Sequence, residues 1–226
     1  ITNKTGALKI ATETTDIAIT IGHTSSEVTV ADNLTVTGTL KEGSVPVKVS
    51  GKETIWVPAS AMYPNTTNGC ARLTQVELSQ GPELKVLDFD KDSDENAQFS
   101  VAFPKSWQAN AGTTAGPVTF QAFFTATSTD TGTVAWGLSA VAVADNDTCD
   151  VAFGTNVVAT AKAHSGTSND INVTAESGDV TIAGAPAADE LVFFQIMRDT
   201  SADSLAADAR LLGIKLFFTT DKKNDA

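Results

Sequence analysis

Residues 97–103 read AQFSVAF, and residues 118–124 read VTFQAFF. Large apolar side chains occupy one alternating set of positions in both stretches: Phe99, Val101, Phe103, Val118, Phe120 and Phe124. Successive side chains of a β-strand leave on opposite faces, so a period of two predicts strands with one buried face. These two segments therefore predict β-sheet that is packed against a second layer.

Apolar stretches of similar length continue along the chain from residue 51 onward. Turn-forming residues separate the apolar stretches, as in NTTNGC, SQGP, ESGD and DNDTCD. The expected strands are 54–58, 72–78, 84–90, 97–103, 117–127, 133–144, 157–161, 170–175, 191–198 and 210–219. The one stretch with helical character is the short ADSLAADAR at 202–210. Many strands without a βαβ rhythm predict an all-β, antiparallel β-sandwich, and eight or more strands favour a jelly roll.

The leading segment, residues 1–50, has a thinner pattern, seen in EVTVADNLTVTGTL at 27–40 and GALKIATETTDIAITIG at 6–22. Its apolar positions alternate with Thr, Asp, Asn and Gly: Leu8, Ile10, Ile17, Ile19, Ile21, Val28, Val30, Leu34, Val36 and Leu40. A single narrow stripe gives too little core for a short chain to fold alone. We therefore expect a β-rich trimeric stem at 1–50, in which identical copies cover one another's stripes, and a jelly-roll knob domain at 51–226.

Several later strands of the knob are apolar at consecutive positions, whereas a sheet that faces water on one side should carry polar residues there. The second faces of these strands are therefore expected to be covered by another subunit. The predicted subunit contacts in the knob are Val192, Phe194, Leu211 and Phe217. Stem and knob thus independently predict a homo-oligomer.

The composition limits the partners. Fifteen basic against 27 acidic residues give a net charge of −12, which argues against nucleic acid and anionic lipid as partners. No apolar run approaches the ~20 residues of a membrane-spanning helix, so no membrane insertion is expected. The start, ITNKTG, lacks Met and indicates a processed or truncated beginning, with a piece upstream. Cys70 and Cys149 form either one disulfide or two unpaired thiols.

No catalytic or cofactor motif stands out. The histidines are His23 and His164, and neither is accompanied by a nucleophile motif. Asp88, Asp90, Asp92 and Asp94 alternate and could present oxygens to Ca²⁺, but the spacing departs from a calcium-binding loop. The preferred interpretation of this run is the end of a strand followed by a loop whose charges are in water. The same interpretation applies to ADNDTCD at 144–150. We expect no enzyme activity, no cofactor and no metal.

Loops provide the predicted ligand contacts. Of three tryptophans that could stack on sugar rings, Trp107 lies at a strand end beside a long loop and is the expected exposed platform. The loops QANAGTTAG, ADNDTCD and HSGTSND are the expected contacts with a host surface glycan or protein. The predicted ligand residues are Trp107, Asn110, Asp145, Asp147 and His164.

Longer phrases carry a family resemblance: VLDFD, DENAQFSVAFPKSW, VTFQAFFTATSTDTGTVAWGL, VTAESGDVTIAGAPAADELVFFQIMRD and DARLLGIKLFFTT. Between Ile55 and Thr220 the sequence resembles virion proteins of tailed bacteriophages, namely fibre, needle-tip or head-decoration proteins with a trimeric jelly-roll knob. The resemblance implies a homotrimeric structural component of the particle surface that contacts other virion proteins.

The function expected from the sequence is a non-enzymatic, fibre- or needle-type virion appendage involved in host attachment. One alternative is a capsid-decorating (cement) trimer that never meets the host. A second is a secreted carbohydrate-binding adhesin module, which predicts a secretion signal in the full gene and binding as a monomer. A β-sandwich glycosidase is a further alternative and requires two carboxylates in a groove.

Overall fold

The computed structural model divides the chain into two compact units, Ile1–Val47 and Lys48–Ala226. The residues it describes are 30, 34–38, 40–42, 45–46, 51–109, 118–187 and 189–220. In the first unit, strands β1 (Lys41–Glu42) and β2 (Val45–Pro46) form an antiparallel pair. The second unit, called the sandwich domain below, contains the other described strands.

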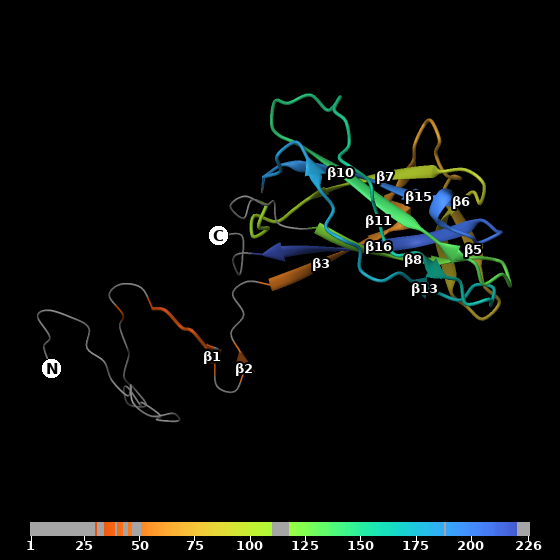
Figure 1. Ribbon diagram of the computed structural model, residues 1–226, viewed down its shortest axis with the longest axis horizontal. Coiled ribbons are helices and arrows are strands. Elements are labelled where there is room, and N and C mark those ends of the chain that lie inside the picture. The colour runs from red at the N-terminus through yellow and green to blue at the C-terminus, as the bar shows by residue number, and fades with distance from the viewer. Residues whose placement is uncertain are drawn as a thin grey trace, which may run out of the picture. The chain divides into compact units, whose positions relative to one another are not determined.

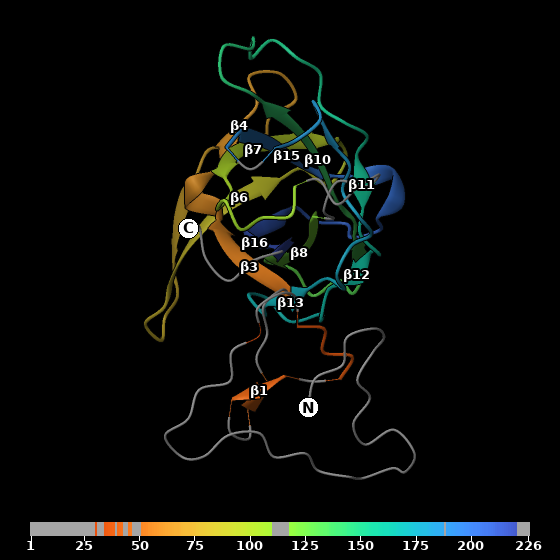
Figure 2. The ribbon, with the colours of Figure 1, turned by 90° about the vertical axis from the view of Figure 1, so that its left-hand side faces the viewer.

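Two sheets form the sandwich domain, and Figure 2 shows their strands as two layers. Sheet I has the order β11 (Val157–Val158), β10 (Trp136–Val143), β15 (Leu191–Arg198), β7 (Glu95–Ala102), β4 (Tyr63–Pro64), with β14 (Ile182–Ala183) also beside β10. Sheet II has the order β13 (Asn172–Val173), β8 (Val118–Thr125), β16 (Ala209–Thr220), β6 (Glu83–Phe89), β5 (Thr74–Glu77), with β3 (Gly51–Pro58) also beside β16. A small pair, β9 (Thr133–Val134) and β12 (Lys162–Ala163), and two 3-10 turns, η1 (Ala59–Ala61) and η2 (Thr200–Ala202), complete the described elements.

The predicted fold class, an all-β, antiparallel sandwich, is confirmed (Figure 1). Every strand pair in the two sheets is antiparallel except β10 with β14. Within the described residues no helix is long and apolar enough to cross a membrane.

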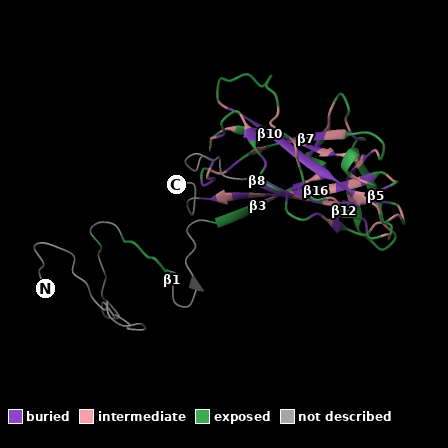
Figure 3. Ribbon diagram, in the orientation of Figure 1, coloured by how far each residue is buried: buried purple, intermediate pink, exposed green. Residues whose placement is uncertain are grey.

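Aromatic rings from both sheets fill the space between the layers, and Figure 3 colours the buried residues of the ribbon purple. The rings of Phe99 and Phe194 are stacked with centroids 5.1 Å apart. Trp136 receives Phe89 edge-on at 5.0 Å and lies 6.0 Å from Phe124. Offset and edge-to-face contacts of this kind add to the stabilisation from apolar burial. The alternating apolar positions of the sequence, such as Phe99 and Phe124, are thus the positions that face the core.

The prediction that Val192, Phe194 and Leu211 contact another subunit is wrong, because all three have zero exposure inside the domain's own core. Both alternating sets of these strands are apolar, and the pattern alone did not show which set faces inward. Phe217 faces outward from β16 and is half-buried, with the Lys52 ammonium 5.6 Å from its ring centroid. Its role in a subunit contact stays a prediction.

The outer face of β10 is also covered by the chain itself. All eight residues of β10 are buried, and the strand is purple throughout in Figure 3. The loop at 144–156 returns across it: the Gly154 amide donates to the Ala140 carbonyl at 3.0 Å, and the Asn156 side chain occupies the space above Gly137. The outer apolar face of β10 is therefore covered by the chain's own loop, and no second subunit is needed to cover it.

In the stem, Val30, Leu34, Val36 and Leu40 are 48%, 67%, 44% and 48% exposed. The remaining predicted stem contacts lie outside the described residues: Leu8, Ile10, Ile17, Ile19, Ile21 and Val28. The trimeric stem stays a prediction.

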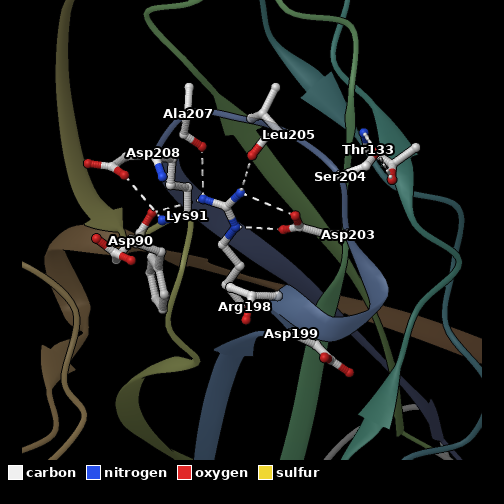
Figure 4. Close-up of polar contacts among 12 residues, drawn as sticks. Asp90, Lys91, Thr133, Arg198, Asp199, Asp203, Ser204, Leu205, Ala207 and Asp208 are labelled. Carbon is white, nitrogen blue, oxygen red and sulfur yellow. Dashed lines mark hydrogen bonds and ion pairs between the residues drawn. The ribbon is translucent and has the colours of Figure 1, made fainter.

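A buried arginine organises the connection from β15 to β16 (Figure 4). Arg198 has zero exposure, and its guanidinium bonds to both carboxylate oxygens of Asp203, at 2.6 and 3.4 Å. It also donates to three carbonyl oxygens, of Phe89, Ala207 and Leu205, at 3.0–3.1 Å. All five N–H groups are thereby used. The helix suggested for 202–210 does not form, and the Leu205 and Ala207 carbonyls of this segment accept from Arg198 in place of backbone amides.

Candidate functional site

Two of the five predicted ligand residues, Trp107 and His164, are buried. Trp107 is 2% exposed, and its ring stacks on Phe103 at 4.2 Å. The turn in which the Trp107 amide donates to Pro104 folds this segment back, and a β-bridge to Thr220 holds it. His164 is 2% exposed, with Nδ1 2.8 Å from the Asp130 carbonyl oxygen.

The expectation of accessible ligand contacts is therefore wrong for Trp107 and His164, because loops adjoining strand ends can fold inward. Asn110 lies outside the described residues. Asp145 and Asp147 are exposed and line a depression on sheet I.

The acidic run at 88–94 is a strand-to-loop transition, as preferred from the sequence. β6 ends at Phe89, and the carboxylates on both sides of this end bind neighbouring groups. Asp88 pairs with Arg210 at 3.2 Å, Asp90 accepts from the Asp92 amide, and Asp94 accepts from the Thr200 amide at 2.9 Å. Among the described residues, no group of three or more His, Cys, Asp or Glu side chains could hold a metal ion.

The cysteine alternatives are also resolved, because Cys70 and Cys149 are both free. Burial raises the pKa of the Cys70 thiol to about 12, and the Glu95 carboxylate acts in the same direction. Cys70 is therefore a neutral core residue at pH 7, whereas Cys149 is exposed.

The exposed tryptophan is Trp56. It lies on the outer side of β3, opposite Lys215 of β16, and 47% of it is exposed, whereas Trp107 and Trp136 are buried. Its neighbour Val57 points into the core, because residues on a strand alternate between faces. The sequence ETIWVP contains an indication of this orientation. Ile55 and Val57 occupy alternating apolar positions, and Trp56, which lies between them, must point to the opposite face of the strand.

A glycine in the neighbouring strand holds the indole in place. β16 has a β-bulge between Leu211 and Gly213, and Gly213 has φ +153°. A Cβ at Gly213 would lie 2.6 Å from the Val57 carbonyl oxygen and 2.7 Å from Cζ2 of Trp56. The benzo ring of Trp56 therefore lies directly against the β16 backbone, where only glycine leaves room.

Trp56 forms one wall of an open groove of about 570 Å³, called the Trp56 groove below. Phe123 of β8 stands nearly perpendicular to it, with centroids 5.2 Å apart and an interplanar angle of 85°. Leu84 and Ile171, the latter 63% exposed, extend the apolar lining. Large, mainly apolar grooves with a few polar groups are the usual form of a ligand site.

Charged groups complete the Trp56 groove. The Lys215 ammonium lies 5.3 Å from the Phe123 ring centroid, which is within cation–π range. Lys85 also lines the groove, and its ammonium donates to the Gln75 side chain. Glu83 is the one carboxylate among the described residues that line it. The arrangement can stack a ring on the indole and place a negative group beside an ammonium.

No protein-family model matches this chain, and no curated protein sequence matches it. Among solved structures, it is similar to a carbohydrate-binding module of family 28, described as specific for non-crystalline cellulose, with TM-score 0.33 and 11% identity over 74% of this chain and 88% of that one. It is also similar to a module named TmCBM61, solved in complex with β-1,4-galactotriose, with TM-score 0.26 and 9% identity over 76% of this chain and 88% of that one. No residue of this chain takes a role from either structure.

Proposed function

We propose that the sandwich domain is a non-catalytic carbohydrate-binding module that stacks an acidic sugar ring on Trp56. The observation that carries this proposal is the half-exposed indole held against Gly213. A pyranose ring has C–H groups on one face, and a rigid aromatic surface removes them from water at little cost in conformational entropy. The fixed Trp56 ring supplies such a surface.

The charges of the Trp56 groove favour a carboxylated or sulfated sugar. Lys215 and Lys85 contribute two ammonium groups against the one carboxylate of Glu83. An ammonium forms charge-assisted hydrogen bonds with a carboxylate or sulfate. Glycoside hydrolysis ordinarily uses two carboxylates, so the single Glu83 among the described lining supports binding without turnover.

Replacement of Trp56 by alanine is expected to weaken binding of oligogalacturonate, a uronic acid chain, by roughly 30-fold, because truncating a central aromatic contact costs about 2 kcal/mol. Binding to the parent should also weaken between 50 and 500 mM NaCl, since salt screens exposed ammonium groups. Titration calorimetry measures both effects. Val158→Ala, an exposed apolar truncation in β11 outside the Trp56 groove, should bind like the parent. Equal affinity of the Trp56→Ala variant would refute the proposal.

A second candidate is the homotrimeric virion appendage, in which the stem joins three sandwich domains at the particle surface. The exposed apolar residues Val30, Leu34, Val36 and Leu40 favour it, because self-association would shield them. Three copies of a weak glycan site would then act together through avidity.

The full chain is expected to have a solution mass of about 70 kDa, three times the 23.4 kDa of one chain. Light scattering coupled to size-exclusion chromatography measures this mass. Serine at all four of these stem positions should return a monomer, because the shielded apolar area is lost. A monomeric parent chain would rule out the appendage but leave the carbohydrate-binding proposal untouched.

A further inference from the structure

The outer face of sheet I carries a second groove, distinct from the Trp56 groove on sheet II. Its walls are two loops, 65–69 after β4 and 144–153 after β10, which project from the same side of the sheet in Figures 1 and 2. The first wall is held by Asn96, whose carbonyl accepts from the Asn65 and Cys70 amides. Its closure requires Gly69, since a Cβ there would lie 2.0 Å from the Asn65 carbonyl oxygen.

The strand register sets the floor of this groove. Tyr63 lies opposite Gln98, and Gln98 lies opposite Gln195, so one aromatic and two amide side chains form a row across three strands. In the next row Phe193 lies opposite Val141 of β10. Outward-facing neighbours in adjacent strands are close enough to contact one ligand together.

Three adjoining depressions make up the groove, with volumes of about 240, 260 and 350 Å³. The first and second share Tyr63 and Gln98, and the second and third share Cys149 and Phe193. They therefore form a continuous path, called the sheet I groove below, which suits an extended chain better than a single compact molecule.

The side-chain amides of this groove are suited to hydroxyl groups. Gln195 Oε1 accepts from Asn65 Nδ2 at 2.8 Å and from Gln98 Nε2 at 3.4 Å. This fixes the Gln98 amide while using one of its two N–H groups and leaving its carbonyl oxygen, among the contacts of the described residues, for a ligand. A sugar hydroxyl both donates and accepts, and a primary amide matches both roles. Tyr63, 50% exposed, adds a ring surface.

The charges of the sheet I groove exclude anionic ligands. No Lys, Arg or His is among the described residues that line it, whereas Asp145, Asp147 and Asp189 line one end. A negative field repels uronates, sulfates and nucleic acids. The occupant that matches amides, ring surfaces and an absence of cations is therefore a neutral polyhydroxylated chain.

We infer that the sheet I groove is a second carbohydrate site, specific for a neutral glycan chain, and that the domain bridges two glycans. The inference rests on the proposed function and extends it to a second ligand class. The grooves lie on the outer faces of opposite sheets, so both can be filled at once.

The test uses the full chain on a glycan array that carries neutral and uronate-containing chains. The parent is expected to bind both groups, and only uronate binding should fall as NaCl rises from 50 to 500 mM. The Tyr63→Ala and Gln98→Ala variants should each lose at least tenfold in neutral binding and keep uronate binding. The Trp56→Ala variant should lose uronate binding and keep neutral binding. The Tyr63→Phe variant, which keeps the ring, should retain most neutral binding.

Bridging is measured by co-precipitation. The parent should bring down the best neutral polymer from the array together with polygalacturonate, whereas Tyr63→Ala and Trp56→Ala should each fail. Parent-like thermal unfolding of the variants excludes misfolding as the cause. The inference is overturned if the parent binds no neutral glycan, or if neutral binding survives both sheet I substitutions. Uronate binding that survives the Trp56→Ala substitution would instead overturn the proposed function alone.

Discussion

The Arg198→Met variant should unfold with a free energy about 3–5 kcal/mol lower than that of the parent, the cost of breaking a buried ion pair by removing one partner. Methionine fills similar volume but offers no donors. Asp203, whose side chain is 3% exposed, would be left with an uncompensated charge, and the carbonyls of Phe89, Leu205 and Ala207 would lose their donor. Phe89 ends β6, whereas Leu205 and Ala207 belong to the connection between β15 and β16. Arg198 joins these two segments, so its loss should loosen the whole connection.

Equilibrium unfolding in urea, followed by tryptophan fluorescence, measures this effect. Arg210→Met is the matched control, because the Arg210–Asp88 pair has side chains 21% and 27% exposed and should cost about 1 kcal/mol or less. The double variant Arg198→Met, Asp203→Leu should recover part of the loss, since it removes the stranded carboxylate. Similar losses in Arg198→Met and Arg210→Met would contradict this account.

The Gly213→Ala variant should lose oligogalacturonate binding by at least about tenfold, approaching the Trp56→Ala variant. The new methyl group would meet the Val57 carbonyl oxygen at 2.6 Å, and the backbone cannot yield without moving β3 away from β16. The indole would then leave its place on the bulge. The backbone conformation itself, φ +153°, adds a cost of about 1–3 kcal/mol to folding.

A second glycine separates the effect of the steric clash from the effect of the backbone conformation. Gly81 also has positive φ, +122°, but a Cβ there meets nothing within 4 Å. Gly81→Ala should therefore show the conformational cost in urea unfolding and keep full binding in calorimetry. If Gly213→Ala binds oligogalacturonate as the parent does, the bulge does not position Trp56.

The strands of the sandwich were readable from the sequence wherever they were long. The predicted 191–198 coincides with β15, and 97–103 and 210–219 fall within a few residues of β7 and β16. β4, β12 and β14 were missed because two residues cannot display a period of two. The sequence also did not show which face of β15 is buried, since Phe193 and Phe194 are equally apolar. Packing against sheet II decides between them and buries Phe194.

The candidate sites were less predictable, because they depend on contacts between distant segments. Trp107, and not Trp56, was the predicted exposed ring, although the alternation in ETIWVP is compatible with an outward-facing Trp56. Nothing in the local sequence indicates that Gly213 lies against the Trp56 ring. Tyr63, Gln98 and Cys149 meet in the sheet I groove only through the strand order. Trp107 was misjudged for the same reason, since the Thr220 bridge that turns it inward lies more than a hundred residues away.

The pairing of β3 with β16 has a mechanical consequence. Trp56 lies five residues after Gly51, where β3 begins, and eight residue pairs join β3 to β16. Tension between a tethered sugar and the polypeptide before Gly51 would run along β3 without crossing the aromatic interior. Because both points of attachment lie on β3, the covalent backbone of this strand carries the load, and the β3–β16 ladder keeps the strand in its place in the sheet.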